Sequence, residues 1–224
     1  MKIIALSDLH GHLVKISESA DVLVIAGDFS PLYCQQDPIG TIGWIESRLI
    51  PWFKKLNVSD FIIVPGNHDF ACTYSFFNDD LKTILSRHGL IGRVHYLNRS
   101  SVKLFGKKFY GIPDTEGLLG WAFSKKFNVD YSFDKDTDIL VTHQPPKVSD
   151  IGFVSEYNKD FGSIDLRNMI LDSKIEVNIC GHIHTGQHGG YKLSLNNGKI
   201  ACIYNVSILD EDYNVAFEPT VIEI

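Results

Sequence analysis

Side chains of the types that bind divalent metal ions occur in five short polar clusters along the chain. The clusters are Asp8-Leu9-His10, Gly27-Asp28, Gly66-Asn67-His68-Asp69, His143 and Gly181-His182-Ile183-His184. Carboxylates, amide oxygens and imidazoles suit manganese, iron, zinc and similar ions. Two such ions held side by side can clamp the attacking and leaving oxygens of a phosphate ester. The residue types therefore indicate a site for divalent metal ions, and phosphoester hydrolysis is one reaction that such a site supports.

Each cluster alone also has an ordinary structural explanation. A glycine followed by an aspartate is a common turn, and an isolated histidine such as His143 is more often a hydrogen-bonding residue than a ligand. The set is harder to explain in this way, since each cluster directly follows a short apolar run. A purely structural reading would need five independent coincidences. The histidines outside the clusters, His88, His95 and His188, are expected to be surface or structural residues.

The apolar runs before the clusters are typical of buried strands. They are Lys2–Ser7, Asp21–Ala26, Asp60–Val64, Asp138–Thr142 and Val177–Cys180. Apolar residues at helical spacing predict helices between these runs, at Ile39–Leu56, Phe77–His88 and Ile164–Leu171. Strands that alternate with helices predict a parallel or mixed sheet covered on both faces. Because ligands bind outside the carboxyl ends of such strands, the clusters should meet at one edge of the sheet.

Two pairs of candidate ligands have the same close spacing. Asp8 and His10 are two residues apart, as are His182 and His184. Side chains two residues apart on an extended segment point to the same side. If the chain stays extended after the strand, each pair should face one metal ion together.

Other parts of the sequence predict a second sheet. The pattern in Val94–Tyr110 predicts two short strands with a turn at Gly106-Lys107. The pattern in Tyr191–Ile224 predicts strands and hairpins, and Asn197-Gly198 is the strongest turn signal. We therefore expect an α/β fold with two packed sheets.

The composition fits a single domain that spans residues 1–224. The chain is 44% hydrophobic and carries a net charge of −6. This acidic balance disfavours nucleic acid as a substrate, because general nucleic-acid binding needs a basic surface. The N-terminal residues do not resemble a signal peptide, no run reaches membrane-spanning length, and the four cysteines lack paired spacing. We expect a cytoplasmic protein with reduced cysteines and no membrane association, and the sequence leaves the oligomeric state open.

In their order, the five clusters resemble the motifs of the calcineurin-like metallophosphoesterases. The resemblance runs from residue 8 to residue 184. It implies a four-layer α/β/β/α sandwich, in which two mixed β-sheets pack face to face and are flanked by helices. It also implies two divalent metal ions at the strand ends, and their ligand types leave manganese, iron and zinc open.

The same resemblance assigns a role to each site residue. One ion would be held by Asp8, His10, Asp28 and His184, and the other by Asp28, Asn67, His143 and His182. Asp28 would therefore be shared. His68 would protonate the leaving group and Asp69 would steer it, while Asn67 would also neutralise charge on the phosphate. The expected reaction is attack of a metal-bound hydroxide on phosphorus, with His68 as the general acid.

Several further segments are similar to the branch that contains class III cyclic-nucleotide phosphodiesterases and the vertebrate metallophosphoesterase-domain proteins. They are Gly111-Ile112-Pro113, Trp121-Ala122-Phe123, Thr142-His143-Gln144-Pro145-Pro146 and Tyr204-Asn205-Val206-Ser207. The branch usually has a glycine where Gln144 stands. Ser/Thr protein phosphatases carry an arginine shortly after the Gly-Asp motif, and none follows Gly27-Asp28 here. A protein phosphatase is therefore disfavoured.

Aromatic residues near the clusters indicate the kind of substrate. Residues 113–133 contain Trp121, Phe123, Phe127, Tyr131 and Phe133. Rings of this kind can stack on a nucleobase, although most single aromatic residues are part of the core. We expect His12, Trp121 and Phe123 to bind a small phosphorylated substrate, with a nucleotide or other small phosphodiester first. A nuclease, a phosphomonoesterase and a scaffold without catalysis are the alternatives.

Overall fold

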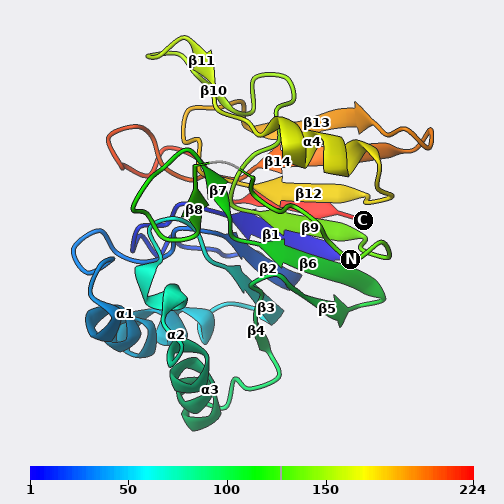
Figure 1. The fold of residues 1–224 in the computed structure, drawn as a ribbon. Coiled ribbons are helices and arrows are strands. Elements are labelled where there is room, and N and C mark those ends of the chain that lie inside the picture. Colours follow the sequence, from blue (N-terminus) through cyan, green and yellow to red (C-terminus); the bar gives the residue numbers. More distant parts are fainter. Residues whose placement is uncertain (127) are drawn as a thin grey trace.

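The first group of apolar runs forms a five-stranded sheet in the computed structural model, which describes residues 1–126 and 128–224 (Figure 1). In spatial order its strands are β15 (Thr220–Glu223), β1 (Lys2–Leu6), β2 (Ala20–Ala26), β3 (Val58–Val64) and β4 (Val94–Tyr96). The strands β1 to β4 are parallel, and β15 is antiparallel to β1. Phe127, one of the aromatic residues noted above, lies outside the described residues.

The second sheet has six strands. In spatial order these are β13 (Gly189–Ser194), β14 (Ile200–Asn205), β12 (Val177–Cys180), β9 (Ile139–Thr142), β6 (Lys107–Ile112) and β5 (Ser100–Leu104). The four inner strands are parallel and the two edge strands are antiparallel to their neighbours. Two short ribbons, β7 (Thr115–Glu116) with β8 (Ser124–Lys125) and β10 (Phe153–Val154) with β11 (Lys159–Asp160), lie outside both sheets.

Of the two hairpin turns predicted for the second sheet, one is confirmed and the other is wrong. The turn at Asn197-Gly198 between β13 and β14 is confirmed. The turn predicted at Gly106-Lys107 is wrong, because Lys107 pairs with Leu104 and the turn residues are Phe105 and Gly106. Both turn residues have positive φ, 48° and 80°, as a tight hairpin with the right-handed strand twist requires. The segment Val94–Tyr110 is also divided, since β4 belongs to the first sheet.

Alternating side chains on each strand build the layers. Ile3 and Ala5 of β1 pack in one buried cluster with residues of the second sheet such as Ile139. Ile4 and Leu6 of the same strand point to the opposite face, into the cluster below the helices. Because every second residue faces the other sheet, the two sheets bury a common core. This arrangement confirms the predicted pair of mixed sheets flanked by helices.

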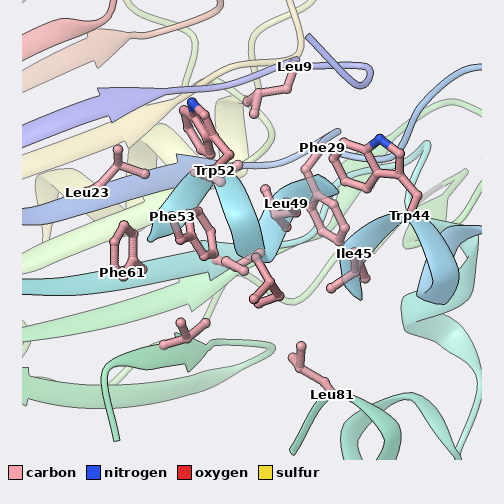
Figure 2. Close-up of a cluster of buried hydrophobic side chains, with 14 of the residues drawn as sticks. Leu9, Leu23, Phe29, Trp44, Ile45, Leu49, Trp52, Phe53, Phe61 and Leu81 are labelled. Atoms are coloured by element: carbon pink, nitrogen blue, oxygen red, sulfur yellow. The ribbon is translucent and has the colours of Figure 1, made fainter. Parts of the chain in front are cut away.

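Helices cover the outer face of each sheet, with α1, α2 and α3 on one side of the stacked sheets and α4 on the other (Figure 1). They are α1 (Pro38–Trp44), η1 (Ile45–Leu49), α2 (Ile50–Phe53), the short 3₁₀ turn η2 (Phe70–Thr73), α3 (Phe77–Arg87) and α4 (Ile164–Leu171). Figure 2 shows Trp52 and Phe53 of α2 against the first sheet, where the rings of Phe53 and Phe61 stack at 4.3 Å. The outer cluster of the second sheet contains Leu166 and Ile170 of α4.

The single helix predicted for Ile39–Leu56 is a composite. Its central residues form one π-helical turn, η1, directly before Ile50 and Pro51. Proline lacks the backbone N–H that an α-helix would use at this point, so the wider turn accommodates it. The helical part ends at Phe53, and the last residues up to Leu56 form turns.

Two further expectations concern the helices and the cysteines. Of the helices described, none has the length and apolar character required to cross a membrane. All four cysteines lie in the described ranges and are free, as expected.

Candidate metal centre

The five clusters meet where the parallel strands of the two sheets end. Asp8 and His10 follow β1, Asp28 follows β2, and Asn67 follows β3. In the second sheet, His143 follows β9, and His182 and His184 follow β12. Each of two groups, Asp8 with His10 and His184, and Asp28 with His143 and His182, has its candidate ligand atoms within 4.8 Å of one another. The structure therefore brings together the carboxylates and imidazoles that the sequence singled out.

The backbone reaches this arrangement in a different way from the extended segments we expected. Asp8 and His10 have φ angles of 57° and 42°, and Asp28 and His182 have φ angles of 54° and 71°. Residues other than glycine adopt this left-handed conformation rarely, and it costs of order 1–3 kcal/mol per residue. The prediction that each pair of ligands lies on an extended segment is therefore wrong. The chain turns sharply after each strand, and this turn aims the side chain at the site.

Asp28 lies between the two groups. Its Oδ2 atom is 3.1 Å from Nε2 of His143 and 3.8 Å from Nε2 of His10. These histidines belong to the second and the first group respectively. One carboxylate therefore reaches both groups, which is the geometry that a shared ligand requires.

The protein atoms leave part of the site without partners. Neither ring nitrogen of His10 has a hydrogen-bond partner among the described residues, although the residue is only 5% exposed. Leaving a buried polar atom unpaired costs about 1–3 kcal/mol. Asp8 and Asp28 are also buried, and their described partners are histidines and backbone N–H groups. A divalent cation would satisfy the unpaired imidazole and neutralise the two buried carboxylates, so these residues fit such an ion.

Burial and mutual charge set the protonation of the site. Burial alone would raise the pKa of Asp28, but the neighbouring His143 outweighs it and holds the pKa well below its usual range. For His143, burial would lower the pKa, but the charge and hydrogen bond of Asp28 raise it to about 9. Burial lowers the pKa of His10 to about 4, and burial together with the charge of His143 lowers that of His182 to about 3. The last two imidazoles are therefore neutral at physiological pH, as metal ligands must be.

Asn67 and Asp69 organise the loop after β3. Oδ1 of Asn67 lies 3.0 Å from Nε2 of His143, which connects the two sheets. The buried carboxylate of Asp69 accepts backbone hydrogen bonds from Gly66, Asp28 and Ser30, at 2.8 to 2.9 Å. Burial and the charge of Asp28 raise the pKa of Asp69 to about 7, against the N–H donors that lower it. Asp69 thus ties the loops after β2 and β3 together, and its carboxylate oxygens are engaged in doing so.

His68 has a partly buried ring, and with His10 and Asp28 it forms a third group whose candidate ligand atoms lie within 4.8 Å of one another. Its Nε2 atom is 3.9 Å from Oδ2 of Asp28, and its ring packs against Trp121 at 4.4 Å between centroids. Nδ1 of His68 lies 2.5 Å from Oε1 of Gln35. Burial lowers the pKa of His68. The resemblance implied that Asp69 steers His68. In the structure the contact with the ring nitrogen comes from Gln35, while the carboxylate of Asp69 accepts backbone hydrogen bonds. A glutamine in a polar loop carries no sequence signal for such a role.

A cavity of about 380 Å³ opens in front of these residues. Its lining contains five residues of the polar clusters, which are Asp28, Asn67, His68, His182 and His184. The other described lining residues are Leu118, Trp121, Val154, Glu156, Tyr157, Ile183, Thr185, Glu211 and Tyr213. Of the three predicted substrate-binding residues, only Trp121 lines the cavity. His12 is exposed outside the lining, and Phe123 packs against the core below the helices.

Tyr213 is a site residue that sequence reasoning did not find. Its ring lies edge-on to His10 at 4.9 Å and to His184 at 5.3 Å. The residue belongs to the loop before β15, far along the chain from the clusters. Glu156, Tyr157 and Glu211 were missed for the same reason, since only the folded chain brings their loops to the cavity.

Comparison with known proteins places these features in context. A profile of the calcineurin-like phosphoesterase family matches residues 1–186. Metallophosphoesterase domain-containing protein 1 of Homo sapiens and its counterpart in Mus musculus are each 25% identical over 211 residues, which cover 83% of this chain. The chain spans 61% of the length of these relatives. The structure is also similar to that of a phosphopantetheinyl hydrolase from Mycobacterium tuberculosis, with a TM-score of 0.53, 14% identity, and coverage of 92% of this chain and 89% of that one.

Proposed function

The chain belongs to the calcineurin-like phosphoesterase family, and from this premise we propose that it hydrolyses small phosphodiesters with the help of two divalent metal ions. Manganese, iron and zinc all suit the oxygen and nitrogen donors of the site. Asp8, His10 and His184 would hold one ion, Asn67, His143 and His182 the other, and Asp28 both. When bound, the ions would activate the attacking water and withdraw charge from the phosphate.

The charge of the cavity lining is the observation that favours a diester. The exposed residues Glu156 and Glu211 add negative charge to the lining, and no lysine or arginine occurs among the described lining residues. A phosphate diester carries one negative charge, whereas a monoester carries up to two at neutral pH. The two ions would attract either ester. Beyond them, the described lining adds Glu156 and Glu211 and no cationic side chain to offset a second substrate charge, so the lining supports a diester better than a monoester.

The protein side chains supply the rest of the proposed reaction. His68 would give the proton on Nε2 to the departing alcohol oxygen as the P–O bond breaks. Asn67, which lines the cavity, would offer its amide N–H donors to a phosphate oxygen. Trp121, Tyr157 and Tyr213 provide apolar surfaces for the organic part of the substrate, which accords with a nucleotide or another small diester with an apolar or aromatic group.

The proposal is tested by comparing two substrates with the same leaving group. With manganese added, kcat/KM should be higher for bis-p-nitrophenyl phosphate than for p-nitrophenyl phosphate. Thr185→Lys places a positive charge on the lining and should shift this ratio toward the monoester, by about three- to tenfold. Ser194→Lys, at the far end of β13, is the matched control and should leave the ratio unchanged. A higher kcat/KM for the monoester with the unaltered protein would contradict the diester preference.

A further inference from the structure

An uncharged side chain holds the outer ring nitrogen of His68. Oε1 of Gln35 lies 2.5 Å from Nδ1 of His68, across 33 positions of sequence. Gln35 belongs to the turn Leu32–Gln36 in front of α1. This turn is fixed by its neighbours, since Cys34 is buried and its carbonyl accepts a hydrogen bond of 2.9 Å from Oγ1 of Thr41. The acceptor is therefore held in place by the fold.

We propose that Gln35 is a positioning residue for catalysis, which fixes the ring orientation and tautomer of His68 so that Nε2 faces the cavity. The inference rests on the proposed function, in which His68 is the general acid. An amide oxygen can only accept a hydrogen bond, so the contact requires a proton on Nδ1. The opposite nitrogen, Nε2, is on the side of Asp28 and the cavity.

The amide oxygen suits both states that a general acid passes through. In the form that acts as the acid, His68 carries a proton on each ring nitrogen and donates from Nδ1 to Gln35. As the P–O bond breaks, the N–H bond at Nε2 breaks and an O–H bond forms on the departing alcohol. His68 is then neutral, with its remaining proton still on Nδ1 and still bonded to Gln35. The step therefore needs no rearrangement on the outer side of the ring.

Two ring contacts also restrict His68, but they do not determine which of its nitrogens faces the cavity. Trp121 packs against the ring at 4.4 Å, and His10 meets it edge-on at 4.6 Å. These contacts limit the position of the ring plane, but neither selects which nitrogen points outward. The contact with Gln35 is the described hydrogen bond that distinguishes Nδ1 from Nε2. Its loss should therefore reduce kcat where proton donation limits the rate, and change KM little.

The decisive experiment compares leaving groups in the metal-loaded protein. Gln35→Met keeps the length of the side chain and removes the acceptor. On a diester with an aliphatic alcohol as leaving group, kcat should fall about tenfold, as expected for one hydrogen bond. On bis-p-nitrophenyl phosphate, whose leaving group needs little protonation, kcat should change less than about twofold. Gln35→Glu restores an acceptor and should recover part of the aliphatic rate. Gln36→Met, at the exposed neighbouring position, is the matched control.

Combining Gln35→Met with His68→Ala distinguishes a failure of the positioning role of Gln35 from a failure of the proposed function. In that background Gln35→Met should have no further effect, because Gln35 acts through His68. If His68→Ala shows the leaving-group dependence and Gln35→Met does not, the positioning role is wrong while the general acid stands. If His68→Ala loses the same rate on both substrates, both assignments fall.

The metal-free protein gives a second readout that does not depend on turnover. Long-range proton–nitrogen NMR spectra report which ring nitrogen of a histidine carries the proton. Neutral His68 should be in the Nδ1–H form in the unaltered protein and should shift toward the Nε2–H form in Gln35→Met, with thermal unfolding confirming that the variant is folded. An Nε2–H form in the unaltered protein would overturn the proposal.

Discussion

Replacement of Gly27 by alanine should displace one metal ligand without disturbing the rest of the fold. Gly27 has a φ of 102°, and a Cβ atom added there would lie 2.1 Å from Nδ1 and 2.5 Å from Cγ of His143. The imidazole would have to move by about 1 Å to restore ordinary contact, whereas metal–ligand distances tolerate about 0.2 Å. The unfavourable backbone angle should also lower the free energy of unfolding by about 1–3 kcal/mol.

The expected consequence for Gly27→Ala is selective. The ion assigned to Asn67, His143 and His182 should bind at least 10–100-fold more weakly, since even the loss of an indirect contact to a ligand has an effect of this size. The ion assigned to Asp8, His10 and His184 should be affected less. Competition with a chelator, followed by elemental analysis, measures the two affinities separately.

Gly43→Ala is the matched control for this experiment. Gly43 lies in α1, and an added Cβ would meet no atom within 4 Å. Alanine in a helix is favoured over glycine by about 0.5–1 kcal/mol, so this variant should be as stable as the unaltered protein or more stable, with unchanged metal binding. Two ions bound with unchanged affinity in Gly27→Ala would refute the placement of His143 as a ligand.

Three further predictions follow from the site. His68→Ala should lose about 10²–10⁴-fold in kcat on a diester with an aliphatic leaving group and far less on bis-p-nitrophenyl phosphate; equal losses would argue against general-acid catalysis. Asp69→Asn should lower the free energy of unfolding by about 2 kcal/mol or more in chemical denaturation of the metal-loaded protein, because an amide cannot accept all three backbone hydrogen bonds; an unchanged midpoint would contradict the role in tying the loops. Because Asp28 raises the pKa of His143 to about 9, metal binding at pH 7 should release a proton from His143, and the apparent metal affinity should rise as the pH approaches 9. Calorimetry in buffers of different ionisation enthalpy measures the number of protons released. The absence of any proton release would count against His143 as a ligand.

The position of the site could be predicted because it depends on a general property of parallel sheets. The apolar runs identified the strands within two residues of their observed bounds, and the polar residues that follow them had to meet at the carboxyl ends. The conformation of the turns could not be predicted in the same way. Aspartate adopts positive φ more often than most residues, but nothing in the sequence distinguishes Asp8 and Asp28 from aspartates in ordinary turns, and the surrounding contacts hold them in this conformation.

Contacts between distant segments account for the remaining differences. Nδ1 of His68 contacts Gln35 and not Asp69, because the chain after β2 lies against the loop after β3 and brings Gln35 to the ring. The cavity wall depends on Trp121, Tyr157 and Tyr213, which come from three separate loops. Phe123 follows Trp121 by two positions but packs against the core instead. Composition near a motif therefore indicated an aromatic wall without identifying which rings form it.

The central claim is that one carboxylate joins two metal ions at the ends of the strands. Anomalous X-ray scattering from crystals of the protein loaded with manganese tests it most directly. We predict two peaks, one beside Asp8, His10 and His184 and the other beside Asn67, His143 and His182, with the carboxylate of Asp28 between them. A single peak, or peaks remote from Asp28, would contradict the account.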